Sequence, residues 1–76
     1  MYSESEQQDL KQFGNNIRNL RKARGFSQES FADAVGLHRT YMGGVERGER
    51  NVSLLNLLKI MRKLEVSSGD ILENIH

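Results

Sequence analysis

The residues best suited to binding an anionic partner lie between positions 39 and 51. They bring cations and hydrogen-bond donors together at short intervals: Arg39, Thr40, Tyr41, Arg47, Arg50 and Asn51. A guanidinium group is permanently charged and can donate two parallel hydrogen bonds to a phosphate or to the edge of a base. Such a group of arginines on an exposed surface has little purpose without an anionic partner.

No comparable group indicates catalysis or metal binding. The chain has no Cys, its two histidines lie far apart in sequence, and no glycine-rich loop has the spacing of a phosphate-binding motif. The sequence predicts a protein that is not an enzyme and that needs no metal, cofactor or small-molecule ligand. It contains no apolar run long enough for a membrane span and no signal-peptide core, so we expect a cytoplasmic protein with one small domain.

Basic charge is concentrated in one part of the chain. The net charge is only +1. Residues 1–16 hold three acids and one lysine, and residues 26–76 are close to neutral, whereas residues 17–25 contain four basic residues and no acid. This basic run is either a solvated helix face or a further contact with a nucleic-acid backbone.

The segment from Gln28 to Gly48 has the pattern of two helices joined by a tight turn. Ala32 is small where two helices would pack closely, and Gly36 stands where the chain must turn. The apolar residues of the segment fall on the inward side of both helices: Phe31, Val35, Leu37, Met42 and Val45. Two helices joined by a short turn that contains glycine form the helix-turn-helix unit of many DNA-binding proteins.

Four helix starts share one pattern, in which an apolar residue precedes the N-cap and another follows at the fourth helical position. The pairs are Phe26 with Phe31, Leu37 with Met42, Val52 with Leu57, and Val66 with Ile71. A first helix is expected from residue 9 to Gly25, or from residue 15 if Gly14 weakens its start. The sequence thus predicts a compact all-α domain of five helices over residues 9–76, preceded by a flexible segment at residues 1–8.

The fourth helix, residues 54–64, is apolar over a wide arc. At about 100° per residue its apolar side chains cover roughly 220°, whereas a helix that faces one core needs little more than about 100°. Either the terminal residues Ile71, Leu72 and Ile75 cover the excess, or a second subunit does. The candidate residues for a dimer interface are Leu55, Ile60 and Val66.

Residues 17–64 resemble the Cro and phage-repressor family of helix-turn-helix regulators, and the stretch HRTYMGGVERGERNVS is similar to the small controller proteins of restriction–modification systems. The resemblance implies a repressor-like fold and a sequence-specific transcriptional regulator. It also implies a homodimer bound to a near-palindromic operator in double-stranded DNA. A prophage-type repressor and an antitoxin-like protein-interaction module are the alternatives.

The resemblance also implies roles for individual residues. Gln28 stands where the family contacts a phosphate. Arg39, Thr40 and Tyr41 open the recognition helix, whose first turn enters the major groove. Arg39 can donate two hydrogen bonds to guanine, while Tyr41 either reaches the DNA backbone or covers the helix surface. The other residues expected at the DNA are His38, Gly44, Arg47, Arg50 and Asn51.

The recognition helix departs from the family pattern at two places. Gly43 and Gly44 replace the polar base-reading side chains that are usual there, so base readout should fall on the first turn, with DNA shape contributing more of the specificity. A close approach of the glycine backbone to the duplex would compensate for them. His38 replaces a better N-cap residue, and we expect it to cap the helix and not to bind a metal.

Arg21 and Glu46 match positions that form an inward-facing ion pair in the family. The resemblance therefore implies a structural role for both, linking the first helix to the recognition helix. Removing one partner of such a pair leaves a buried charge without compensation.

Overall fold

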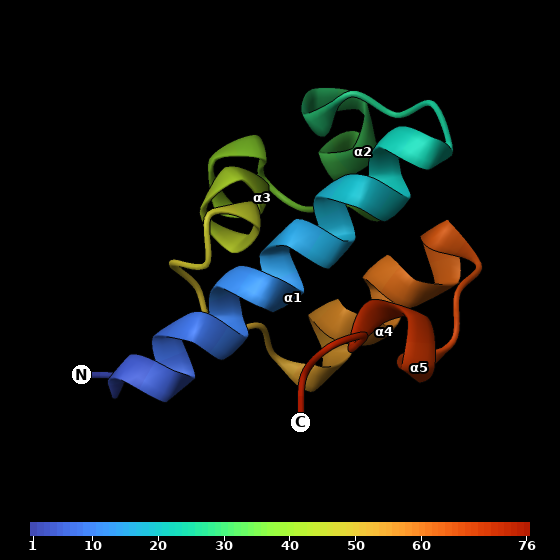
Figure 1. The fold of residues 1–76 in the computed structure, drawn as a ribbon. Coiled ribbons are helices and arrows are strands. Elements are labelled where there is room, and N and C mark those ends of the chain that lie inside the picture. The colour runs from blue at the N-terminus through green and yellow to red at the C-terminus, as the bar shows by residue number, and fades with distance from the viewer.

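Five α-helices and no strands make up the computed structural model, which describes all 76 residues. The helices are α1 (Glu4–Ala23), α2 (Gln28–Val35), α3 (Arg39–Glu46), α4 (Leu54–Leu64) and α5 (Ser68–Ile71). The long helix α1 runs through the middle of the molecule, with α2 and α3 on one side and α4 and α5 on the other (Figure 1). The prediction of an all-α, five-helix fold is confirmed.

Capping side chains set the start of each helix. Ser27, Ser53 and Ser67 cap α2, α4 and α5, each accepting a hydrogen bond from the backbone N–H three residues on. At α5 the Asp70 carboxylate also accepts a hydrogen bond from the backbone N–H of Ser67, at 3.1 Å. These interactions are local in sequence, which is why the four later helices begin where the sequence predicts.

The first helix begins earlier than predicted. Ser3 Oγ accepts a hydrogen bond from the Glu6 N–H at 3.1 Å, and Glu6 Oε1 accepts one from the Ser3 N–H at 2.8 Å. This capping box starts α1 at Glu4. The expectation of a flexible segment at residues 1–8 is therefore wrong for residues 4–8, which form an exposed first turn and a half.

Nine apolar side chains form the core, and every helix contributes at least one: Phe13, Ile17, Phe31, Ala32, Met42, Val45, Ile60, Leu64 and Ile71. Ile60 is completely buried in this cluster, so its proposed place in a dimer interface is wrong. Leu57 of α4 and Ile75 near the C-terminus are both partly buried against this core, and together with Leu72 they line one groove, so the C-terminal residues approach the apolar face of α4. No helix is both long enough and apolar enough to cross a membrane.

Gly14 lies in the middle of α1, where the end of α3 passes too close for a side chain. A Cβ atom at this position would lie 2.6 Å from the carbonyl oxygen of Glu46 and closer still to that of Val45. Both obstacles are backbone atoms, which cannot move aside without shifting α3. The glycine that weakens the helix locally is thus required by the packing of α1 against α3.

Gly14→Ala is expected to destabilise the domain, although the same change in an open helix stabilises by about 1 kcal/mol. Crowding of this kind typically lowers the free energy of unfolding by roughly 1–3 kcal/mol. Urea denaturation of the variant measures the change, with Asn15→Ala, on the exposed face of the same helix, as the control. An unfolding midpoint at or above that of the parent would contradict the close contact of α1 with α3.

Candidate nucleic-acid interface

The α2–α3 unit has the geometry of a helix-turn-helix. Gly36 ends α2 in the left-handed conformation, with φ at +80°, and its N–H donates back to the carbonyl oxygens of Ala32 and Asp33. The N–H of Leu37 also donates to Ala32 O, at 2.9 Å. Ala32 is completely buried between the helices. Ala32 therefore allows the close packing of the two helices, and Gly36 allows the tight turn between them, as the sequence pattern predicts.

A polar depression lies where the start of α2 meets the start of α3. It is open, has a volume of about 420 Å³, and is lined by no apolar residue. Its lining is Gln28, His38, Arg39, Thr40 and Arg47. Five of the residues predicted to contact DNA are thus brought together from α2, from α3 and from the N-cap and C-cap positions of α3.

Only the first turn of α3 is available to a ligand. Arg39 and Thr40 are exposed, and Tyr41 is half-buried. The remaining five residues of the helix, from Met42 to Glu46, are buried. Any base contact made by α3 would therefore come from its first turn, where the sequence also predicts it.

Arg39 is held only weakly in the free protein. Its Nη1 lies 3.5 Å from Glu29 Oε2, and both side chains are 67% exposed. An ion pair as exposed as this contributes little to stability because water and salt screen it. Arg39 can therefore leave Glu29 for a base edge at small cost.

Arg47 makes a closer ion pair on the same face. Its Nε and Nη2 donate to the two carboxylate oxygens of Glu49 at 3.0 and 3.2 Å. This contact lowers the pKa of Glu49. Both side chains are exposed, so the guanidinium remains accessible to a phosphate.

Tyr41 covers the surface of α3. Its hydroxyl accepts a hydrogen bond from Asn56 Nδ2 at 3.3 Å, and the Arg50 guanidinium carbon lies 6.0 Å from the centre of its ring. Of the two roles considered for Tyr41, this arrangement favours covering the helix. Arg50 stacks on the ring as a cation–π partner and stays exposed.

Side chains cover the two glycines of α3. A Cβ at Gly43 would lie 3.1 Å from Arg47 Nη1 and 3.3 Å from Gln28 Oε1, and one at Gly44 would lie 3.0 Å from Arg50 Cγ. Arg50 thus lies in front of Gly44 in the free protein, so the expected contact of the Gly44 backbone with DNA requires this exposed side chain to move aside and stays a prediction.

His38 caps α3, as expected. Its Nδ1 accepts a hydrogen bond from the backbone N–H of Thr40 at 3.2 Å. The lone pair of that nitrogen is thus used by the helix, and a neutral imidazole carries its proton on Nε2. Nε2 is the atom of His38 that can meet a ligand in the depression.

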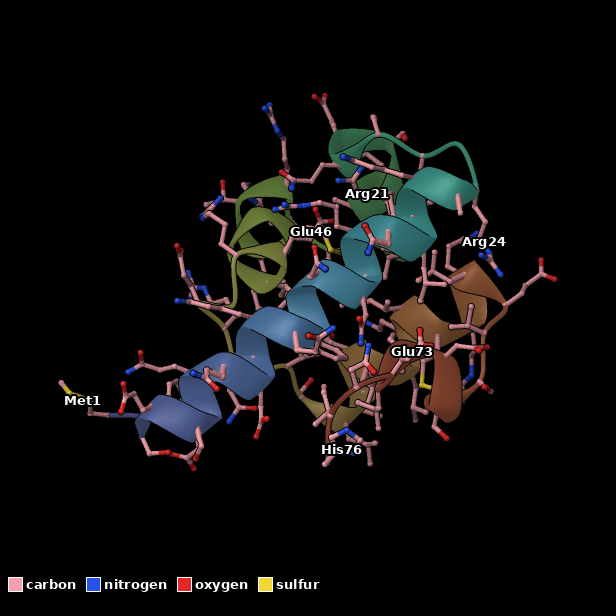
Figure 2. The ribbon with its side chains drawn as sticks, viewed as in Figure 1. Met1, Arg21, Arg24, Glu46, Glu73 and His76 are labelled. Atoms are coloured by element: carbon pink, nitrogen blue, oxygen red, sulfur yellow. The ribbon has the colours of Figure 1, made fainter.

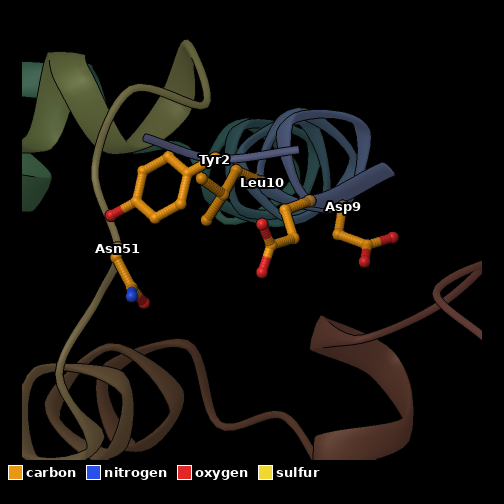
Figure 3. Close-up of a pocket in the computed structure, with 5 residues that line it drawn as sticks. Tyr2, Asp9, Leu10 and Asn51 are labelled. Carbon is orange, nitrogen blue, oxygen red and sulfur yellow. The ribbon is translucent and has the colours of Figure 1, made fainter. Parts of the chain in front are cut away.

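Asn51 is separated from this cluster. It is exposed in the loop after α3 and lines a small depression with Tyr2 and residues of the N-terminal part of α1. In Figure 3 the ring of Tyr2 and the side chain of Leu10 lie beside it, with Asp9 beyond. Its neighbours are therefore apolar and acidic groups rather than the arginines of the polar depression.

The predicted ion pair of Arg21 with Glu46 is present and buried. Arg21 Nε donates to Glu46 Oε2 at 2.7 Å and Nη2 donates to Oε1 at 2.8 Å, with the two side chains 8% and 0% exposed. The two residues point toward each other between α1 and α3 (Figure 2). Arg21 Nη1 also donates to the carbonyl oxygen of Phe26 at 3.0 Å.

Two further donors reach Glu46 Oε1: Arg18 Nε at 3.5 Å and Gln28 Nε2 at 3.1 Å. Burial alone would raise the pKa of Glu46, but the hydrogen bonds from Arg21, Gln28 and Arg18 and the charge of Arg21 outweigh it and lower the pKa. The hydrogen bonds of Arg18 and Gln28 to Glu46 are not predicted from the sequence, since no spacing connects these residues to Glu46.

The chain belongs to the helix-turn-helix family, whose model matches residues 17–71. Within the family it is similar to control proteins: C.MunI of Mycoplasma sp is 45% identical over 69 residues, which cover 88% of this chain and 93% of that relative. The chain is a DNA-binding transcriptional regulator that resembles the controllers of restriction–modification systems.

Solved structures agree with this assignment. The restriction–modification controller protein C.AhdI from Aeromonas hydrophila superimposes with a TM-score of 0.80 at 50% identity, covering 84% of this chain and 97% of that one. A helix-turn-helix transcriptional regulator from Vibrio cholerae superimposes with a TM-score of 0.81 at 33% identity, covering 92% of this chain and 39% of that one.

Proposed function

We propose that the chain acts as a homodimer that controls the genes of a restriction–modification system by binding a near-palindromic operator. The observation that carries the proposal is the exposed first turn of α3. Arg39 and Thr40 project from it at a wholly polar depression, while the rest of the helix is buried. The similarity to named controller proteins favours this regulator over a prophage-type repressor.

In the proposed complex the first turn of each α3 enters the major groove. Arg39 donates two hydrogen bonds to O6 and N7 of a guanine, and Thr40 contacts a base edge or a thymine methyl group. Gln28, Arg47 and Arg50 surround this turn and bind phosphates, which sets the register of the protein on the duplex. His38 Nε2 is placed to donate a further hydrogen bond beside them.

Footprinting on the DNA upstream of the chain's own gene tests the proposal. A two-fold symmetric dimer must present its two α3 helices to successive major grooves, so the centres of the protected half-sites should lie about 10 base pairs apart. No protection there, with a folded protein that binds another protein instead, would favour the antitoxin-like module.

The exposed leucines at the start of α4 are the proposed dimer contact. Leu54 and Leu55 are 68% and 71% exposed, side by side in sequence on a helix whose other apolar residues are at least half-buried. Val66 is half-buried and remains a candidate for the edge of the interface. Large apolar side chains left exposed together often mark a protein interface.

Sedimentation at micromolar protein is expected to show a species of twice the chain mass. Leu55→Glu should convert it to a monomer, because a charge would be buried at the contact. Arg62→Glu, an exposed position on the same helix, is the control and should leave the dimer intact. A parent protein that stays monomeric with and without DNA would remove the dimer from the proposal.

A further inference from the structure

Gln28 connects the polar depression to the buried ion pair. It is the first residue of α2 and it lines the depression. Its Nε2 donates at 3.1 Å to Glu46 Oε1, the same oxygen that accepts from Arg21 Nη2 at 2.8 Å. A carboxylate can only accept hydrogen bonds, so the NH₂ group of Gln28 must face Glu46. The contact fixes both the path of the side chain and the orientation of its amide.

Gly43 provides the space for this path. The Gln28 amide oxygen would be 3.3 Å from a Cβ atom at position 43, and the Gln28 carbonyl carbon Cδ would be 3.8 Å away. A larger side chain there would push the amide away from Glu46. Gly43 weakens α3. Because it has no side chain, Gln28 can lie across the helix and reach the Glu46 carboxylate.

We propose that Glu46 is a positioning residue for DNA binding, which holds the amide of Gln28 ready for a phosphate, and that Gly43 makes this contact possible. The inference rests on the proposed function, in which Gln28 binds the DNA backbone. The second N–H of the Gln28 amide has no partner in the protein and remains available to a phosphate oxygen. Glu46 thus serves both the α1–α3 ion pair and the DNA-binding surface.

Positioning of this kind strengthens binding because the side chain is already ordered in the free protein. A flexible glutamine loses rotamer freedom when it binds, and that loss typically weakens binding by about two- to tenfold per side chain. With Gln28 held by Glu46, most of the loss is incurred on folding and little on association. Loosening Gln28 should therefore weaken operator binding without removing any atom that touches DNA.

The test is a double-mutant cycle of Gln28→Met and Glu46→Gln on operator affinity, measured at low temperature where circular dichroism shows every variant folded. Gln28→Met should weaken binding by removing the phosphate contact. Glu46→Gln should weaken it by about two- to tenfold when Gln28 is present, and should change nothing further in the Gln28→Met background. Independent losses that multiply in the double variant would overturn the proposal.

A second cycle uses Gly43→Ala with Gln28→Met, for the case that Glu46→Gln does not fold. A Cβ at 43 would meet the ends of both Arg47, at 3.1 Å, and Gln28, at 3.3 Å. Gly43→Ala should therefore weaken operator binding more when Gln28 is present than in the Gln28→Met background. Gly44→Ala is the matched control: a Cβ there meets Arg50 and not Gln28, so any loss of affinity that it causes should be equal with and without Gln28. Equal losses from Gly43→Ala with and without Gln28 would overturn the role of Gly43.

An NMR titration gives a readout that does not involve DNA. Gln28→Met should raise the pKa of Glu46, because one of the hydrogen bonds that lower it is lost. An unchanged pKa would show that Gln28 does not contact Glu46 and would overturn the proposal. If instead the pKa rises but Gln28→Met binds the operator like the parent, the phosphate contact of the proposed function is the part that fails.

Discussion

Glu46→Ala is expected to lower the free energy of unfolding by roughly 3–5 kcal/mol, enough to leave a domain of this size marginally stable. The substitution removes the only carboxylate that contacts Arg21, whose side chain is 8% exposed. A guanidinium left without its partner in that place keeps only the hydrogen bond to Phe26 O. The large effect comes from this uncompensated charge and not from the strength of the pair itself.

Arg39→Ala is the matched control for this measurement. Arg39 is exposed, and its ion pair with Glu29 is long and exposed as well. Its removal should change the free energy of unfolding by less than about 0.5 kcal/mol. Urea denaturation of both variants gives the comparison. If Glu46→Ala unfolds at the same urea concentration as the parent, the ion pair between Arg21 and Glu46 does not stabilise the domain.

The same carboxylate should make stability depend on pH in the acid range. The pKa of Glu46 is lower in the folded chain than its ordinary value of 4.5. Its contribution is therefore complete above about pH 4.5 and is lost as the pH falls through the folded value. Glu46→Gln should remove this part of the acid dependence, whereas Glu49→Gln, at a fully exposed pair, should change it little.

Helix starts were predictable because capping is local. The bonds that begin α2 and α5 join residues three apart, Ser27 with Ser30 and Ser67 with Asp70. The start of α1 carries the same signal at Ser3 and Glu6. The apolar pattern does not indicate this start, because it begins only at Leu10 and the turns before it are exposed.

Packing over long sequence separations was not predictable. Gly14 suggests a weak helix when taken alone, and only the position of α3 shows why a side chain is excluded there. The apolar arc of α4 likewise does not reveal which part faces the core, so Ile60 was assigned to a surface while Leu54 proved exposed. A helical projection gives relative angles but not the direction of the neighbouring helices.

Only some contacts of the candidate DNA-binding surface could be predicted, for the same reason. The family resemblance identified Arg21 with Glu46, and the position of Arg39 on the first turn of α3. It did not reveal that Gln28 also binds Glu46, or that Arg50 covers Gly44, because both depend on long side chains crossing between elements. Gln28 and Arg50 are therefore the residues for which the structure adds contacts that the sequence does not predict.

Arg39→Ala is expected to weaken operator binding by about 1–3 kcal/mol per half-site. The reason is geometric: Arg39 is the only cation on the exposed turn of α3, and the helix beyond Tyr41 is buried. No other side chain of that helix can form two hydrogen bonds to a guanine. The loss should therefore be concentrated at one symmetric base position.

Arg50→Ala is the control for a contact with the DNA backbone. Arg50 follows α3 and stacks on the ring of Tyr41, and in the proposed complex it binds a phosphate and no base. Its loss should weaken binding to all sequences alike and make the salt dependence of the affinity shallower by about one charge. The two arginines therefore differ in the quantity that their loss changes: Arg39→Ala should change the base preference, and Arg50→Ala should change the salt dependence of the affinity.

The most direct test is a titration of the parent and Arg39→Ala against the footprinted operator and every single-base variant of one half-site. The parent should lose affinity at several positions, including one guanine. Arg39→Ala should bind the operator and the variants of that guanine equally well, while it keeps the parent's preferences elsewhere. An Arg39→Ala protein with the parent's full pattern of base preference would contradict sequence reading by the first turn of α3.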